Sequence, residues 1–185
     1  MEDDRRVSLP IVTERLVLRP FRDEDLDALV AYRNDAEVAR YQDWDGISRE
    51  DALAMVRSQR QTSLGAPGRW QQIALDRGGE LVGDLGLFLG ADGRSAALGF
   101  TLARQHQGFG LAREALSGLI DALFERPELE RLEAVTDARN APAMALLGRL
   151  GFTIGSTAAA TFKGGECREH TYVLPRRADR VRFRR

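Results

Sequence analysis

A glycine-containing stretch in the middle of the chain has the residue types and spacing needed to bind an anion. Gly108 and Gly110 follow a short apolar run at residues 96–102 and precede a helical pattern that starts at Leu111. The start of a helix offers backbone N–H groups without intrahelical acceptors, together with partial positive charge from the helix dipole. Glycine lets such a backbone approach a ligand closely. The stretch therefore predicts a phosphate or pyrophosphate site that needs no basic side chain.

Two common nucleotide-binding loops do not fit this spacing. The stretch contains neither Gly-x-Gly-x-x-Gly nor Gly-Lys-Ser/Thr, and the single lysine of the chain, Lys163, lies far downstream. A dinucleotide fingerprint also belongs to the first strand of its βαβ unit, whereas this loop lies in mid-chain. The spacing that fits is Gln-x-x-Gly-x-Gly, with Gln105, Gly108 and Gly110 at the fixed positions.

This spacing resembles the acyl-CoA pyrophosphate loop of the GNAT (general N-acetyltransferase) superfamily. A second motif covers residues 140–152, where a helical pattern begins at Asn140 and ends in Leu-Gly-Phe, and it is similar to the next helix of that superfamily. The span from about Thr13 to about Leu174 is similar to the branch that contains the ribosomal-protein N-terminal acetyltransferases, the RimJ/RimL-like enzymes. The alternative is an unrelated α/β domain with a glycine-capped helix.

The resemblance implies an α/β (α+β) fold whose mixed, mostly antiparallel sheet of about seven strands splays at the CoA site and is flanked by helices. It implies acetyl-CoA as the cosubstrate, with the pantetheine arm pairing with strand backbone in the splay. Asn140 would contact the cofactor arm as well as cap its helix, and His106 would lend its backbone rather than act as a base. The implied cofactor-binding residues are Thr101, Leu102, Gln105, His106, Gln107, Gly108, Phe109, Gly110, Leu111, Ala112 and Asn140.

The groups that serve as acid and base in many relatives are missing. Those relatives have a Tyr or a smaller hydroxyl residue after the helix-capping Asn, and a Glu just before the glycine of the cofactor strand. This sequence has Leu147, Ala143 and Ala97 there. A missing base is more tolerable for an α-amino group, which titrates at about 7.7–8.0, than for a lysine side chain, which titrates at about 10.4. We therefore expect the acceptor to be an α-amino group or another amine of low pKa, and not a lysine side chain.

One carboxylate and two aromatic residues are candidates for the acceptor side. Asp84 lies on the strand next to the cofactor strand and is the best placed carboxylate for a water-relayed base; the alternative is a partly exposed strand residue without a role. Tyr41 and Trp44 lie in a loop that borders the acceptor in relatives, so they are candidate substrate-binding residues. Trp44 could instead belong to the core.

Composition excludes several other classes of protein. A chain of 185 residues is long enough for one sizeable core, and a net charge of −1 gives no case for nucleic-acid binding. No run of about 18 apolar residues or signal-peptide core is present, so we expect a cytoplasmic protein without a membrane partner. One cysteine and two histidines supply neither a disulfide nor a zinc site, so no metal is expected. Cys167 and His170 fall on opposite faces of an expected strand and do not form a thiol dyad.

The elements that would position these residues follow the order βααα-βββ-α-β-α-ββ. Strands are expected over residues 13–21, 70–76, 80–89, 96–102, 131–137, 152–162 and 168–174. Asp23 is the expected cap of the first helix, a second helical piece covers residues 35–40, and a capping box at Ser48 opens a third helix that runs to about residue 62. Residues 41–46 and 63–68 are expected loops.

The boundaries of the domain are predicted from the same patterns. Residues 1–11 are an expected loose lead-in, and residues 12–175 are the expected N-acetyltransferase domain. Residues 176–185 contain six arginines and are expected to form a solvated basic tail.

The function predicted from the sequence is direct transfer of an acetyl group from acetyl-CoA to a primary amine, with a protein or peptide α-amino group as the expected acceptor. One alternative is an enzyme that acetylates a small-molecule amine, such as an antibiotic. Another is a non-catalytic acyl-CoA-binding module. A weaker idea gives the arginine tail a ribosome or RNA contact. Relatives often dimerise, so a homodimer is a further expectation.

Overall fold

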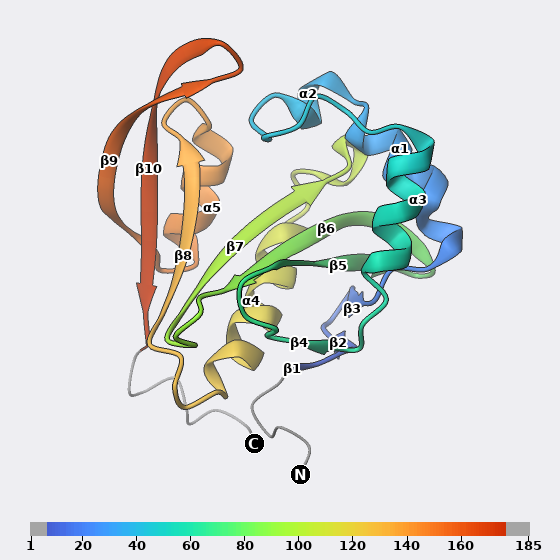
Figure 1. Cartoon of the computed structure of the whole chain (residues 1–185), viewed down its shortest axis with the longest axis horizontal. Coiled ribbons are helices and arrows are strands. Elements are labelled where there is room, and N and C mark those ends of the chain that lie inside the picture. Colours follow the sequence, from blue (N-terminus) through green and yellow to red (C-terminus); the bar gives the residue numbers. More distant parts are fainter. Residues whose placement is uncertain (1–6, 177–185) are drawn as a thin grey trace.

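An eight-stranded, mostly antiparallel sheet forms the centre of the structure, a computed structural model that describes residues 7–176 (Figure 1). The strand order is β2-β3-β5-β6-β7-β8-β10-β9, and β7 and β8 are the parallel neighbours. A separate two-stranded ribbon joins β1 to β4. The strands are β1 (Val7–Ser8), β2 (Ile11–Val12), β3 (Val17–Arg19), β4 (Ser63–Leu64), β5 (Trp70–Arg77), β6 (Glu80–Leu89), β7 (Ser95–Leu102), β8 (Arg131–Asp137), β9 (Thr153–Phe162) and β10 (Gly165–Pro175).

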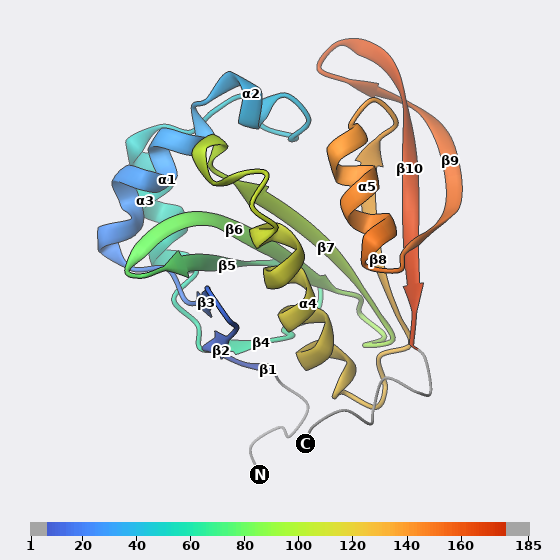
Figure 2. The ribbon, with the colours of Figure 1, turned by 180° about the vertical axis from the view of Figure 1, so that it is seen from behind.

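Helices cover both faces of this sheet. α4 and α5 lie on one face, and α1 and α3 lie on the other (Figures 1 and 2). The helices are α1 (Leu26–Arg33), α2 (Ala36–Ala39), α3 (Arg49–Ser58), α4 (Leu111–Phe124) and α5 (Ala141–Arg149). Short 3-10 turns precede α1 at Asp23–Asp25 and follow β7 at Arg104–His106. The predicted fold class is therefore confirmed, with eight strands in the main sheet instead of about seven.

Alternation along β6 separates the two sides of the molecule. Leu85 and Leu87 are fully buried in the core that α4 covers. Asp84 has the opposite parity and contacts α1, whose Leu29 packs in a second core with α3. The turn between β5 and β6 consists of Gly78 and Gly79, both with positive φ, as a tight hairpin requires. The predicted hairpin is therefore present. The alternation along β6 directs the Asp84 carboxylate away from the face that α4 covers.

The helix starts at Ser48 and Asn140 are confirmed by their caps. The Ser48 hydroxyl accepts the Asp51 N–H at 3.0 Å, and the Asn140 side chain accepts the Ala143 N–H at 3.2 Å. α3 ends at Ser58, earlier than expected.

The expected first strand over residues 13–21 is present but shorter, as β3 from Val17 to Arg19. β2 and β3 form a short antiparallel pair, and a turn between them is closed by the Thr13 N–H and hydroxyl, which both bond the Leu16 carbonyl. Asp23 does not cap α1 either. Asp25 accepts the Arg22 N–H at 2.8 Å and faces Arg19, so the chain makes a 3-10 turn before α1 begins.

Three further segments differ from expectation. Val7–Ser8 of the expected loose lead-in pairs with Ser63–Leu64 of an expected loop, because Val7 and Leu64 are both buried in the main core. Arg176 does not behave as part of a solvated tail: its guanidinium donates to the carbonyls of Phe124 and Leu129 at 2.7 and 2.8 Å and so satisfies groups at the end of α4. The rest of the expected tail lies outside the described residues.

The parallel strands β7 and β8 pair over a short distance and then separate. Ser95, Ala96 and Ala97 are in register with residues 131–133, and no pairing continues beyond them within the described strands. The gap opens towards the C-terminal ends of both strands, as Figure 1 shows. The predicted splay is therefore confirmed.

Candidate active site

The loop after β7 has the backbone geometry that the sequence predicts for an anion site. Gly108 and Gly110 have φ angles of 83° and 78°, in the left-handed region that favours glycine. Gly110 directly precedes α4, so the first-turn amides of α4 project towards the loop without intrahelical acceptors. The loop residues are exposed apart from His106, which is half-buried. In Figure 2 the loop lies at the start of α4, beside the open end of the splay.

Side chains of the loop hold it against the sheet. The Gln107 side-chain amide donates to the carbonyl of Leu102, the last residue of β7, at 3.0 Å. His106 Nε2 lies 3.6 Å from a Glu80 carboxylate oxygen. These contacts fit the expectation that His106 contributes its backbone, although a role for it stays a prediction. Thr101 and Leu102 are buried, and Leu102 already shares its carbonyl with Gln107.

A clamp from the N-terminal segment fixes the other side of the loop, and sequence reasoning missed it. Arg15 donates from Nη1 to the Phe109 carbonyl at 3.0 Å and from Nε to Glu114 at 2.7 Å. The other Glu114 oxygen accepts the Thr13 hydroxyl and the Arg15 N–H, both at 2.6 Å. Burial raises the pKa of Glu114, but these hydrogen bonds outweigh it and hold the pKa below its ordinary value. The clamp thus joins β2–β3, the loop and α4.

Replacing Arg15 with alanine is expected to raise the KM for acetyl-CoA roughly tenfold, because one residue makes two charge-assisted contacts that set the loop. Steady-state kinetics at saturating acceptor would measure this change. Arg57→Ala, which removes an exposed arginine of α3, is the matched control and should leave KM unchanged. Equal acetyl-CoA affinity in Arg15→Ala and the control would show that the clamp does not position the loop.

The start of α5 closes the opposite side of the splay. Asn140 uses its side-chain oxygen as a helix cap, so the simpler of its two expected roles is present. Ala143 and Leu147, which stand where relatives carry hydroxyl groups, are 5% and 1% exposed and pack in the interior. Neither side chain carries a group that could act as an acid, and contact of Asn140 with a cofactor stays a prediction.

Asp84 lies in a polar cluster on the face of the sheet that α1 and α3 cover. It is 2% exposed, which rules out the alternative of a partly exposed strand residue. Its carboxylate accepts a short hydrogen bond from the Tyr32 hydroxyl and faces Arg33 Nη2 at 3.3 Å. Asp84 is in register with Thr101 on β7, one strand from the splay. The carboxylate is thus buried one strand away from the gap and is held by two donors from α1.

The cluster keeps its donors protonated. Burial raises the pKa of Tyr32 well above its ordinary value, and the nearby Asp84 charge raises it further. For Arg33, burial lowers the pKa, but the charges and hydrogen bonds of Asp84 and Tyr32 together outweigh this effect and the net shift is upward. Tyr32 and Arg33 are therefore hydrogen-bond donors throughout the range in which an amine acceptor titrates. Sequence reasoning missed both residues, because only the fold brings α1 to β6.

Of the two candidate acceptor residues, Trp44 lies beside this cluster. The Trp44 ring is half-buried against the α1–α3 core, and the Arg33 guanidinium lies 4.8 Å from its centroid. Trp44 therefore packs with the core and also borders the polar cluster. The Tyr41 hydroxyl donates to the Arg139 carbonyl at 3.3 Å and so reaches across to the connection between β8 and α5. Acceptor binding by either residue stays a prediction.

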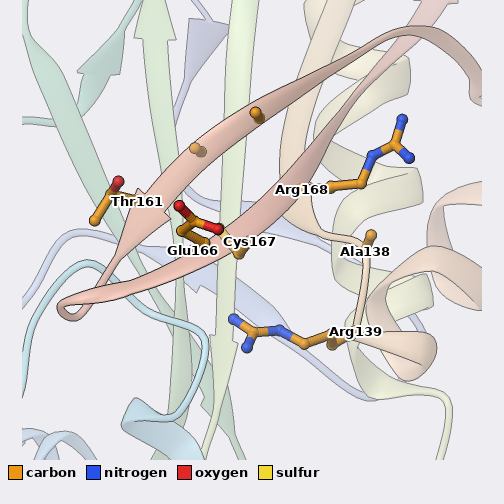
Figure 3. A pocket seen from close by; sticks show the side chains of 8 residues that line it. Ala138, Arg139, Thr161, Glu166, Cys167 and Arg168 are labelled. Carbon is orange, nitrogen blue, oxygen red and sulfur yellow. The ribbon is translucent and has the colours of Figure 1, made fainter.

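A hollow of about 740 Å³ lies between the β9–β10 hairpin and the residues that connect β8 to α5 (Figure 3). Arg139 on its wall is paired with Asp137 at 2.5 Å, and this hydrogen bond lowers the pKa of Asp137. Burial raises the pKa of the neighbouring Cys167 thiol. His170 instead contacts Thr157 at 2.7 Å. This contact engages the His170 ring with β9 and not with Cys167.

Two classes of site are not found in the described part of the chain. Residues 7–176 contain no group of three or more His, Cys, Asp or Glu side chains that could hold a metal ion. No helix among the same residues is long and apolar enough to cross a membrane.

A mostly antiparallel sheet that splays beside a glycine loop at a helix start defines an acyl-CoA-dependent transferase fold. The acetyltransferase (GNAT) domain model matches residues 15–153, and the chain therefore belongs to the GNAT family and is an N-acetyltransferase. It is 33% identical over 147 residues to the uncharacterized N-acetyltransferase p20 of Bacillus licheniformis, covering 77% of this chain and 81% of that protein. It is 31% identical to the uncharacterized N-acetyltransferase YoaA of Bacillus subtilis, covering 76% of this chain and 80% of that protein.

Solved structures agree with the fold. A Vibrio cholerae protein with a provisional assignment as a ribosomal-protein-serine acetyltransferase is 27% identical, with a TM-score of 0.74 over 92% of this chain and 99% of its own. RimL, a ribosomal L7/L12 alpha-N-protein acetyltransferase solved with coenzyme A, superposes with a TM-score of 0.79 at 20% identity, covering 90% of this chain and 98% of RimL. The chain thus shares its fold with ribosomal-protein acetyltransferases.

Proposed function

We propose that this N-acetyltransferase transfers the acetyl group of acetyl-CoA to the α-amino group of a protein or peptide. Acetyl-CoA is the donor that the GNAT family membership supports. The pyrophosphate would bind to backbone amides between Gln105 and Ala112, and the pantetheine arm would lie in the splay beside Thr101 and Asn140. The likeness to ribosomal-protein acetyltransferases supports the choice of acceptor.

The observation that carries the acceptor class is the chemistry around the splay. Ala97, Ala143 and Leu147 leave the places of the usual acid and base without a titratable group, and the carboxylate that remains, Asp84, is held by two donors. Near pH 7.5 about a third of an α-amino group is already neutral, against roughly a thousandth of a lysine side chain. A site with so little base chemistry is therefore suited to an α-amino acceptor.

The reaction balances without a covalent enzyme intermediate. The neutral amine attacks the thioester carbonyl carbon, backbone N–H groups stabilise the oxyanion, and the carbon–sulfur bond then breaks. The amine loses one proton, and the leaving CoA thiolate gains one. We propose that Asp84 accepts the amine proton through a water molecule, since its carboxylate is the nearest titratable group of β6 to the cofactor strand.

The test compares acceptors at equal concentration. CoA thiol release would be followed with acetyl-CoA, a peptide with a free N-terminus and no lysine, and an N-terminally blocked peptide with one internal lysine. We expect at least about a tenfold preference for the free N-terminus at pH 7.5, because of the difference in neutral amine. A lysine preference would contradict the proposal. Turnover confined to a panel of small-molecule amines would favour the small-molecule enzyme instead.

Two other expectations from the sequence, a homodimer and a cytoplasmic location, stay predictions.

A further inference from the structure

The tip of the β9–β10 hairpin reaches across the molecule to the segment that follows α2. The Lys163 ammonium donates to the carbonyls of Ala39 and Trp44 at 2.8 and 3.0 Å and contacts the Asp45 carboxylate at 2.6 Å. An ammonium group has three N–H donors, so these partners match its full capacity. Lys163 is also the one lysine among 185 residues. A single side chain thus joins segments that are more than a hundred residues apart in sequence.

The backbone at the tip is unusual for a residue with a side chain. Lys163 has φ of 49° and is the non-glycine residue with positive φ among residues 7–176; Gly164, which follows it, has φ of 75°. Glycine and asparagine favour both positions of such a two-residue hairpin turn. A lysine there adopts a strained backbone conformation, and the compensating feature is the set of contacts that its side chain makes. The lysine at position 163 therefore serves the contacts of its side chain and not the conformation of the turn.

The contacts of Lys163 with residues 39–45, called the bridge below, lie over the open end of the splay. Figures 1 and 2 both show the hairpin tip and α2 facing one another above the point where β7 and β8 diverge. The hydrogen bond from Tyr41 to the Arg139 carbonyl makes a second connection in the same direction. A hollow of about 290 Å³ lies between the two connections, lined by Arg40, Tyr41, Arg139, Phe162, Lys163 and Gly165. The bridge thus forms one wall of an opening on the acceptor side.

A series of contacts connects Lys163 to the polar cluster around Asp84. Lys163 holds the backbone of Trp44, the Trp44 ring lies against Arg33, and Arg33 faces Asp84. Asp45 is 85% exposed, so its ion pair with Lys163 is worth little by itself. The two carbonyl contacts fix the segment, since they act on backbone that carries both Tyr41 and Trp44.

We propose that Lys163 is a positioning residue for the acceptor: it ties the hairpin tip to residues 39–45 and thereby sets how tightly the amine substrate binds. This inference rests on the proposed function, in which the acceptor approaches from this face. In the proposed function the pyrophosphate of acetyl-CoA binds at the start of α4, away from Lys163, so the affinity for acetyl-CoA should not depend on the bridge.

Lys163→Gly is the informative variant, because it removes the side chain and also relieves the backbone conformation at the tip. The thermal unfolding midpoint should therefore not fall. We expect the acceptor KM to rise roughly tenfold while kcat and the acetyl-CoA KM stay within about twofold, since a charge-assisted tether is lost. Lys163→Arg keeps a cation with several donors and should restore most of the acceptor affinity. Asp45→Asn, which touches the exposed partner, should have little effect.

A second measurement does not depend on turnover. Amide hydrogen exchange of residues 39–46 should be faster in Lys163→Gly than in the wild type or in Lys163→Arg, while exchange in α4 stays the same. Unchanged acceptor KM together with unchanged exchange would overturn the inference. If the wild type acetylates a small-molecule amine and no peptide, the proposed function fails. The inference about Lys163 is then tested by measuring the KM of the wild type and of Lys163→Gly for that small-molecule amine.

Discussion

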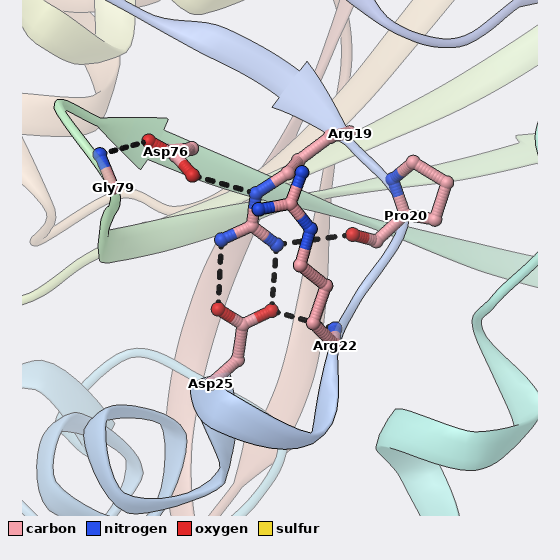
Figure 4. A network of polar contacts seen from close by, with 6 residues as sticks. All are labelled: Arg19, Pro20, Arg22, Asp25, Asp76 and Gly79. Atoms are coloured by element: carbon pink, nitrogen blue, oxygen red, sulfur yellow. Dashed lines mark hydrogen bonds and ion pairs between the residues drawn. The ribbon is translucent and has the colours of Figure 1, made fainter.

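Replacing Arg19 with methionine is expected to lower the free energy of unfolding by about 3–5 kcal/mol at neutral pH, because the change leaves two buried carboxylates without a counter-ion. Arg19 and Asp25 are 3% exposed and Asp76 is 6% exposed. Figure 4 shows the three side chains converging between β3, the turn before α1 and the end of β5. The network therefore connects β3, the turn before α1 and β5.

The geometry of this network leaves few polar atoms without a partner. Arg19 Nη1 and Nη2 make a bidentate pair with Asp25 at 2.7 and 2.8 Å, and Nε contacts Asp76 at 2.7 Å. The remaining Asp76 oxygen accepts the Gly79 N–H at 2.7 Å, and Asp25 also accepts the Arg22 N–H at 2.8 Å. A satisfied buried network rigidifies its surroundings, and removal of its central cation exposes the full desolvation cost of both acids.

The loss in Arg19→Met should shrink in acid. Burial raises the pKa of Asp76, but the bonds from Arg19 and Gly79 outweigh it and hold the pKa below its ordinary value of 3.8. A carboxylate with a lowered folded-state pKa contributes stability above its unfolded pKa and loses it as the pH falls through the folded value. The wild type therefore loses this contribution below about pH 4. The variant lacks the Arg19 bond that lowers the pKa of Asp76, so the stability difference between the two proteins should shrink as the pH falls through this range.

Urea unfolding followed by circular dichroism at pH 7 and at about pH 3 would measure both effects. Arg60→Ala is the matched control, since it breaks an exposed pair with Asp23 on the same turn and should change stability by less than about 1 kcal/mol. If Arg19→Met does not fold, the milder Asp76→Asn still reports the sign of the effect. If Arg19→Met and Arg60→Ala lowered the free energy of unfolding equally, the buried network would contribute no more to stability than an exposed ion pair.

The features predicted correctly from the sequence are those with local causes. The glycines at 108 and 110 are needed for positive φ within their own loop, and Asn140 caps a helix that starts one residue later. The β5–β6 hairpin follows from its Gly78-Gly79 turn and the alternation on either side. The splay itself came from resemblance to a family and not from the residues.

The errors and omissions have long-range causes. Asp23 has the residue type of a cap, but the ion pair of Arg19 with Asp25 favours a 3-10 turn there. Residues 63–64 form a strand because Val7 supplies the partner. Arg15 meets Glu114, and Lys163 meets Ala39, across about a hundred residues of sequence. No pattern within one segment predicts such pairs, since they depend on how the sheet places its edges.

The largest expected effect on activity is that of Asp84→Asn, which should lower kcat by about 100-fold at pH 7.5. Asparagine keeps the shape of the side chain and can still accept the hydrogen bond from Tyr32, but it cannot take a proton. We expect a loss of kcat at the lower end of the range that is usual when a general base is removed, because part of an α-amino acceptor is already neutral. Initial rates at saturating substrates would measure the loss.

The dependence of this loss on pH separates a base from a residue that only holds its neighbours. If Asp84 takes the amine proton, solvent hydroxide should replace it in part at high pH, and the ratio of wild-type to variant kcat should fall between pH 7.5 and pH 9.5. Tyr32→Phe is the control: it removes the short hydrogen bond but leaves the carboxylate, so its smaller loss should not depend on pH over this range. Thermal unfolding of both variants would exclude a loss of fold.

A constant loss at every pH would contradict the role of Asp84 as a base. Its carboxylate would then act by fixing Arg33 and Tyr32 and, through Arg33, the ring of Trp44. In that case Asp84→Asn should raise the acceptor KM in the same way as Lys163→Gly, because both changes release one end of the same chain of contacts. The proton would instead leave the amine directly to water, which an acceptor of low pKa permits.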